Sequence, residues 1–149
     1  MQRVFFRWVA PKAEFIPSDS GAEFMPEITQ WNGSYLILNG NAKQVLGDTL
    51  ASLGEILSLA GACKDKWLFN PTSRLGNEII DPEKTKSTYF DDGSWDRLEQ
   101  LVFNDEAEKL VPCLFTLEID RGVNLYCTDS FKAVVEKNGL QGLNFEEVA

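Results

Sequence analysis

The densest group of side chains that could do chemistry lies near the middle of the chain, where three aspartates and a glutamate surround a tryptophan. Asp91, Asp92 and Asp96 carry the oxygen ligands that Ca²⁺ and Mg²⁺ prefer. Their spacing lacks the alternating D-x-D-x-D-G pattern and the later bidentate glutamate of an EF-hand loop. The pattern therefore predicts a turn followed by a helix start, with no metal and no other cofactor.

Carboxylate pairs can also hydrolyse glycosides, but one of the two acids must then be desolvated to raise its pKa. Most acids of this chain sit in hydrophilic stretches, and the chain has no histidine. Histidine is the commonest acid-base group and the usual partner of a nucleophilic serine or cysteine. No P-loop, G-x-G-x-x-G or G-x-S-x-G motif is present. We expect a protein that is not an enzyme, with a carboxylate-dependent enzyme as the less favoured alternative.

The formal net charge of −9 is unevenly distributed. Residues 78–108 hold 10 acidic and 3 basic residues, whereas residues 1–77 hold 7 of each. Such a segment repels nucleic-acid backbones and favours a basic protein partner, through steering more than through raw affinity. A solvated acidic face that aids solubility is the plainer interpretation of the same charges.

Two aromatic residues adjoin this acidic segment. Phe90 and Trp95 could anchor a protein interface whose rim is charged, although a first-turn tryptophan that packs on a sheet gives the same pattern. Tyr89 and Trp67 are expected in or beside the core. The hypothesis for a partner-binding surface within residues 89–108 names five residues: Asp91, Asp92, Trp95, Asp96 and Glu99.

The elements that must position these residues follow from spacing and turn signals. Ser94 can cap a helix over "WDRLEQLVF", in which Trp95, Leu98, Leu101 and Val102 share a face. Before it lies a long polar stretch, residues 72–94, with turn signals at Asp81-Pro82 and Asp92-Gly93. The sequence thus predicts a loop that leads into a helix.

Strands and helices are predicted elsewhere from the same rules. Strands are expected at 2–10, 13–16, 35–38, 56–59, in "KDKWLFNP", on both sides of Asp120-Arg121-Gly122, and at 143–148. One helix is expected from a cap at Asn39 or Asn41 to a left-handed Gly54. A second is expected from a cap at Thr128, Asp129 or Ser130 to Asn138-Gly139, with Leu140 completing a Schellman motif.

These elements define an α+β fold with a mixed or antiparallel sheet and a few short helices, in a single domain over residues 1–149. One arrangement recurs at 35–59 and 126–148: a strand, a helix that contains "AKQVL" or "FKAVV", a glycine and a second strand. Duplication and convergence explain this repeated unit equally well. Three scattered cysteines and the lack of a signal peptide or a membrane-spanning run indicate a soluble, cytoplasmic protein.

Two stretches together resemble a known family. "KWLFNPTSRLGNEIID" and "SFKAVVEKNGLQGLNFEEV" are similar to the immunity-protein domain family typified by a myxobacterial protein and found beside polymorphic and type VI secretion toxins. The similarity lies in Trp67 to Thr72 with Asp81, in Ser130-Phe131-Lys132 and in Gly142-Leu143-Asn144-Phe145. The sequence departs from the family pattern at "SRLGNEII", residues 73–80.

The resemblance implies an immunity protein that binds and neutralises a cognate antibacterial toxin, with no catalytic residues. The acidic segment fits this role, because an inhibitor of a basic-surfaced toxin needs a complementary surface. A non-enzymatic scaffold or regulatory binding domain shares every one of these sequence features. The sequence leaves the oligomeric state open, a homo-oligomer included.

Overall fold

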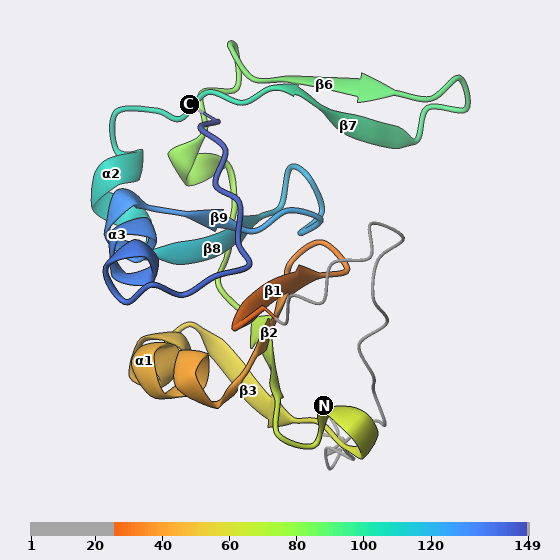
Figure 1. Cartoon of the computed structure of the whole chain (residues 1–149). Coiled ribbons are helices and arrows are strands. Elements are labelled where there is room, and N and C mark those ends of the chain that lie inside the picture. The colour runs from red at the N-terminus through yellow and green to blue at the C-terminus, as the bar shows by residue number, and fades with distance from the viewer. Residues whose placement is uncertain (1–25, 149) are drawn as a thin grey trace, which may run out of the picture.

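The computed structural model describes residues 26–148, which form an α+β fold (Figure 1). The strands predicted at 2–10 and 13–16 lie outside these residues. The described strands are β1 Ile28–Trp31, β2 Tyr35–Leu38, β3 Gly54–Ser58, β4 Trp67–Pro71, β5 Arg74–Leu75, β6 Lys86–Tyr89, β7 Trp95–Gln100, β8 Leu114–Leu117 and β9 Tyr126–Cys127. The α-helices are α1 Gly40–Ala51, α2 Ala107–Leu110 and α3 Asp129–Lys137, with short 3-10 turns at Gly61–Cys63 and Asn77–Ile79.

Four antiparallel strands form the first sheet, in the order β1-β2-β4-β3. Leu36 of β2 lies opposite Phe69 of β4, so both side chains leave the same face. Leu46 and Leu50 of α1 cover that face and are fully buried with them. The apolar stripe of α1 and the alternation of β2 thus build one core.

Helix α1 begins where the sequence predicts and ends earlier. The side chain of Asn39 accepts a hydrogen bond from the backbone N–H of Ala42 at 2.9 Å, which confirms it as the N-cap. The helix ends at Ala51, with Ser52 at the C-cap position. Gly54 does not close it in a left-handed conformation, because Gly54 already belongs to β3 and pairs with Pro71. A Cβ on Gly54 would lie 2.1 Å from the carbonyl oxygen of Asn70, so close strand packing explains this glycine.

The second sheet has the order β5-β8-β9 and mixes parallel and antiparallel pairs. Strand β8 is buried along its whole length, and the hairpin predicted around Asp120-Arg121-Gly122 is confirmed. Phe115 stacks on Tyr126 of β9, with 5.8 Å between ring centroids. Around this pair lies a second apolar cluster that includes Ile79 and Leu117.

Helix α3 confirms its predicted end. Gly139 has a φ of +65°, and the N–H of Leu140 donates to the carbonyl of Val135 at 3.0 Å. This is the Schellman arrangement. At the other end Thr128 occupies the N-cap position without capping through its side chain, because its hydroxyl is 2.7 Å from that of Ser130.

The strand predicted at 143–148 is wrong. The segment has no strand ladder; instead the carbonyl of Gln141 accepts hydrogen bonds from the N–H groups of Glu27 and Ile28 at 3.0 and 3.2 Å. Leu143 and Phe145 then pack on the first core as single side chains. The second copy of the proposed repeat therefore lacks its last strand, whereas the first copy continues into β3.

The helix predicted over residues 95–103 is also wrong, because residues 95–100 form strand β7 and pair antiparallel with β6. Gly93 has a φ of +86°, and the Asp92-Gly93 turn reverses the chain directly after β6. The backbone of residues 95–100 therefore pairs with β6.

Candidate partner-binding site

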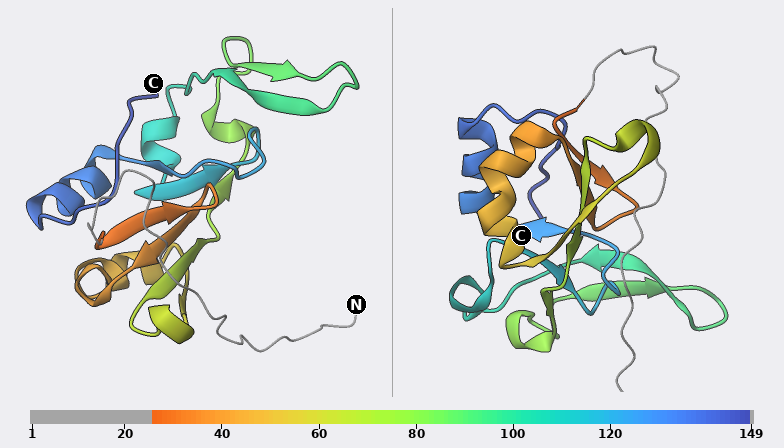
Figure 2. Two further views of the ribbon diagram at one scale, coloured as in Figure 1. Left: turned by 45° about the vertical axis from the view of Figure 1, so that its right-hand side comes forward. Right: turned by 90° about the horizontal axis from the view of Figure 1, so that it is seen from below.

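The five residues predicted to bind a partner all lie on the hairpin of β6 and β7, residues 86–100, here called the arm. The two strands pair with each other and with no other described strand. Figure 1 shows the arm lying across one end of the molecule, with its turn extending past the body, and the second view in Figure 2 shows the same overhang. All five residues therefore lie on a projecting element, which is a β-hairpin and not a loop that leads into a helix.

The tip of the arm is held by Asp92. Its Oδ1 atom accepts a hydrogen bond from the N–H of Ser94 at 2.9 Å and one from the Ser94 hydroxyl at 2.5 Å. These two donors, the hydroxyl first, lower the pKa of the Asp92 carboxyl below its ordinary value. The N–H of Phe90 donates to the carbonyl of Ser94 at 2.8 Å and closes the turn. The tip therefore presents a fixed, ionised carboxylate beside the exposed Asp91.

Asp96 and Glu99 occupy unusual positions in the arm. The strand register pairs Tyr89 with Trp95 and Thr88 with Arg97, which leaves Asp96 without an opposite residue. A second shift between Leu98 and Gln100 leaves Glu99 unpaired in the same way. Such bulges bend and twist a ribbon and make its edge a poor template for further strands. Asp96 also accepts a hydrogen bond from the Thr88 hydroxyl at 3.0 Å, whereas Glu99 is exposed.

The exposure of the aromatic residues of the arm differs from the prediction. Trp95 is half-buried, and its Nε1 atom is buried without a hydrogen-bond partner among the described residues. Tyr89 and Phe90 are 64% and 58% exposed, so the expectation of a core position for Tyr89 is wrong. Once the turn at Asp92-Gly93 is taken as a hairpin turn, both residues fall beside its tip. The Asp92-Gly93 turn signal could therefore have identified Tyr89 and Phe90 as exposed residues.

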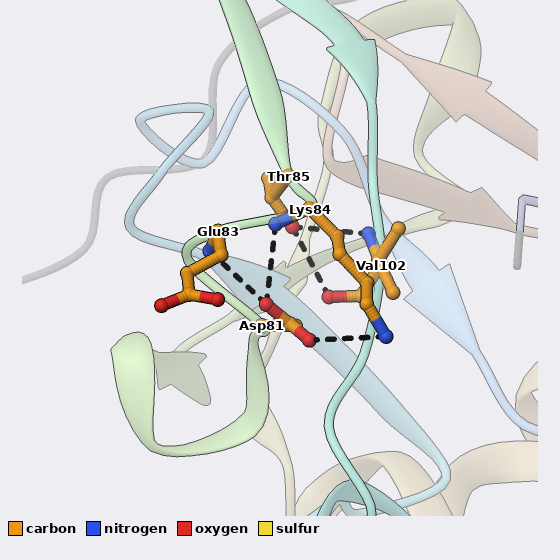
Figure 3. Close-up of polar contacts among 5 residues, drawn as sticks. All are labelled: Asp81, Glu83, Lys84, Thr85 and Val102. Atoms are coloured by element: carbon orange, nitrogen blue, oxygen red, sulfur yellow. Dashed lines mark hydrogen bonds and ion pairs between the residues drawn. The ribbon is translucent and has the colours of Figure 1, made fainter.

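The base of the arm is fixed by a polar cluster around Asp81 (Figure 3). Asp81 Oδ1 accepts hydrogen bonds from the N–H groups of Glu83 and Lys84 at 3.0 and 3.1 Å. The Lys84 ammonium lies 3.7 Å from Asp81 Oδ2. The predicted turn at Asp81-Pro82 is thereby confirmed, and it delivers the chain into β6.

Thr85 ties this turn to the strand that returns from the tip. Its hydroxyl donates to the carbonyl of Val102 at 3.1 Å and accepts from the N–H of Val102 at 3.0 Å. The N–H of Asp81 donates to the same carbonyl at 2.9 Å, and Ile80 bridges to Phe103. The arm is therefore anchored to the buried Ile79–Ile80 pair at both of its ends.

Asp120 is the one acidic residue in the described part of the chain that is fully buried. Its carboxylate accepts hydrogen bonds from the Tyr126 hydroxyl at 2.6 Å, the Asn124 amide at 3.1 Å and the N–H of Gly122 at 3.1 Å. Burial, followed by the hydrogen bond to Asp120, raises the pKa of the Tyr126 phenol. This network satisfies a buried acid and shapes the connection between β8 and β9.

An open depression of about 550 Å³ lies beside α1 and is lined partly by Ile56 and Trp67. The Lys43 ammonium lies 4.6 Å from the centre of the Trp67 ring, a cation–π contact. Gln44 and Asp48 are the other polar residues of its wall. The depression holds no pair of carboxylates, and within residues 26–148 no group of three or more metal-ligating side chains gathers.

No protein-family model matches the chain, and no curated protein matches it. The likeness to the immunity-protein family therefore stays a prediction that rests on the quoted motifs. No helix within residues 26–148 has the length and apolar character needed to cross a membrane.

Proposed function

We propose that this chain is a cytoplasmic immunity protein that binds and neutralises a cognate antibacterial toxin of a polymorphic or type VI secretion system through protein–protein contact. The observation that carries the proposal is the arm, a projecting hairpin with acidic residues at its tip and along β7. A narrow element that extends past the body can enter a concave site on another protein. The quoted sequence motifs support the same role.

Charge favours a toxin with a basic surface. Asp91, Asp92 and Glu99 are exposed on the arm, and Asp105, Glu106 and Glu108 are exposed near its base. Only two cationic residues, Lys86 and Arg97, lie on the arm itself. Complementary charge of this kind speeds association and excludes wrong partners, and salt weakens both effects.

The arm is also well suited to binding because it is ordered before the partner arrives. The Asp92–Ser94 hydrogen bonds fix its tip, and Asp81 and Thr85 fix its base. A preorganised surface loses less conformational entropy on binding than a mobile loop would. Preorganisation therefore lets a small contact area bind more tightly.

Co-expression with the product of the adjacent gene, as the candidate toxin, tests the proposal. We expect growth rescue and co-purification of the two chains. The absence of both would overturn the immunity role. A complex that forms without rescue would contradict neutralisation and favour a scaffold role instead.

Charge reversal locates the contact. In Asp91→Lys with Glu99→Lys, the two altered carboxylates make no hydrogen bond within the described residues, so the arm should keep its shape. We expect weaker toxin binding and a smaller salt dependence. Asp48→Lys with Asp65→Lys makes the same net charge change at exposed sites away from the arm and serves as the matched control. Equal binding by both double variants would rule out the arm as the acidic contact.

A further inference from the structure

Three turns that are far apart in the sequence point to the same side of the molecule. They are the β1–β2 turn at 32–33, the arm tip at 90–94 and the β8–β9 turn at 120–123. Figure 1 and both views of Figure 2 show all three facing away from the side on which α1 and α3 lie. One face of the protein is therefore built from turns, and the opposite side from helices.

Two of these turns are in direct contact. Gly33 has a φ of +87°, and a Cβ on it would lie 2.3 Å from the carbonyl oxygen of Val123. Arg121 and Gly122 also have positive φ values, of 59° and 72°. The backbone of the β1–β2 turn thus packs against the β8–β9 turn. This contact joins the two turns into one continuous surface.

Most of the exposed large apolar residues lie in or next to these turns. Among residues 26–148, seven large apolar side chains are exposed, and four of them lie on or next to the three turns. They are Trp31 at 54%, Tyr89 at 64%, Phe90 at 58% and Val123 at 49%. The Trp31 ring is held against Tyr35, with 5.8 Å between centroids. Rigid, exposed aromatic side chains are the composition of an interface hot spot.

We infer that the three turns form one docking face, with Trp31, Tyr89, Phe90 and Val123 as its apolar contacts and the acids of the arm tip on its rim. The occupant is a protein whose matching surface has an apolar centre and a cationic rim. Charge complementarity to Asp91 and Asp92 specifies the rim. The inference rests on the proposed function in one respect, because it takes this partner protein to be the toxin.

The two parts of the face have different roles. Carboxylates at an interface rim mainly raise the association rate, in a salt-dependent way. Desolvated aromatic anchors mainly slow dissociation, and salt changes their contribution little. A variant at Trp31 should therefore raise the dissociation rate constant, whereas a variant at Asp91 should lower the association rate constant. Both changes weaken binding.

The test measures the kinetics of binding to the co-expressed toxin. We expect Trp31→Ala, Phe90→Ala and Val123→Ser each to raise Kd at least about tenfold through faster dissociation. Leu110→Ala and Val134→Ala, at two exposed apolar positions away from the three turns, are the matched controls and should bind as the unaltered chain does. Thermal unfolding of every variant checks that the fold is retained.

Two outcomes overturn the inference and leave the proposed function intact. In one, Trp31→Ala and Val123→Ser bind normally while the Asp91→Lys, Glu99→Lys double variant does not, which would confine the contact to the arm. In the other, the unaltered chain forms a dimer by sedimentation and Trp31→Ala makes it monomeric, which would assign the face to a second copy of this chain. Absence of any complex is a separate result that contradicts the proposed function itself.

Discussion

The hydroxyl of Thr85 and the main chain of Val102 hydrogen-bond in both directions, at 3.1 and 3.0 Å. This one side chain joins the segment that enters the arm to the segment that leaves it. Beyond this point β6 and β7 pair with no other described strand. The orientation of the arm on the body therefore depends on a contact that lies well away from the proposed binding surface.

Thr85→Val keeps the shape of the side chain and removes both hydrogen bonds. We expect faster hydrogen exchange of the amides in residues 86–100 and a free energy of unfolding lower by about 1–2 kcal/mol. Exchange measured by mass spectrometry and denaturant unfolding check the two effects.

Thr49→Val is the matched control, because Thr49 is exposed on α1 and its hydroxyl makes no hydrogen bond in the described structure. Its exchange and stability should match those of the unaltered chain. Unchanged amide hydrogen exchange in the arm of Thr85→Val would show that the Thr85–Val102 hydrogen bonds do not hold the arm.

The elements set by local signals were predictable. Asn39 caps α1, and Gly139 with Leu140 ends α3, because a cap and an apolar stripe act over a few residues. The α+β class followed from the succession of these elements.

The structure of residues 95–103 was not predictable from apolar spacing alone. Trp95, Leu98 and Leu101 fit a helical period, but the Asp92-Gly93 turn brings this backbone against β6, and pairing decides the structure. Similarly, Leu143 and Phe145 look like strand residues but lack a ladder partner and pack singly. In both segments long-range contacts override local spacing.

The candidate site was partly predictable for the same reason. The charge pattern and the Asp-Gly turn locate Asp91 and Asp92 in one exposed place. The bulge positions of Asp96 and Glu99 depend on strand register, which apolar spacing did not indicate here. The turns beside Trp31 and Val123 face the same side as the arm tip only through the three-dimensional fold, so no local motif identifies these two residues.

Ser94→Ala should raise the pKa of the Asp92 carboxyl toward its ordinary value, because the hydroxyl is the stronger of the two donors that lower it. A lowered pKa means that this contact stabilises the tip above the unfolded-state pKa. The stabilisation is lost as pH falls through the lower folded-state pKa. Carboxyl chemical shifts followed by NMR during a pH titration measure the change.

Ser87→Ala is the control for this titration, since Ser87 lies in β6 of the arm and its hydroxyl does not contact Asp92. It should leave the pKa of Asp92 unchanged. An unaltered titration in Ser94→Ala would contradict the role assigned to the hydroxyl.

Tyr126→Phe should lower the free energy of unfolding at pH 7 by about 1–3 kcal/mol, because Asp120 stays buried and loses its 2.6 Å hydrogen bond. It should also remove a pH effect. The pKa of Tyr126 is raised, so its stabilising contribution is complete below the ordinary tyrosine pKa of about 10 and is lost as pH rises through the folded-state value. Urea unfolding at neutral and alkaline pH tests both expectations.

Tyr89→Phe makes the same chemical change at a residue that is 64% exposed. Its effect on stability should stay within about 0.5 kcal/mol. If the two variants were equally stable at pH 7, the Asp120–Tyr126 hydrogen bond would not contribute to folding.

Gly142→Ala should be the more damaging of two glycine substitutions. Gly142 has a φ of +123°, and a Cβ there would lie 2.1 Å from the carbonyl oxygen of Ile28. The strain and the displaced tail, which carries Leu143 and Phe145 onto the first core, should together lower the free energy of unfolding by at least about 1–3 kcal/mol. Denaturant unfolding measures this loss.

Gly47→Ala is the opposite case, because Gly47 lies inside α1 with open space around its Cβ position. It should stabilise the protein by about 0.5–1 kcal/mol. A Gly142→Ala protein as stable as the unaltered chain would contradict the close approach of the tail to β1. The expected contrast would give the Gly142-Leu143-Asn144-Phe145 motif an architectural role, since its glycine and two apolar side chains dock the tail on the sheet.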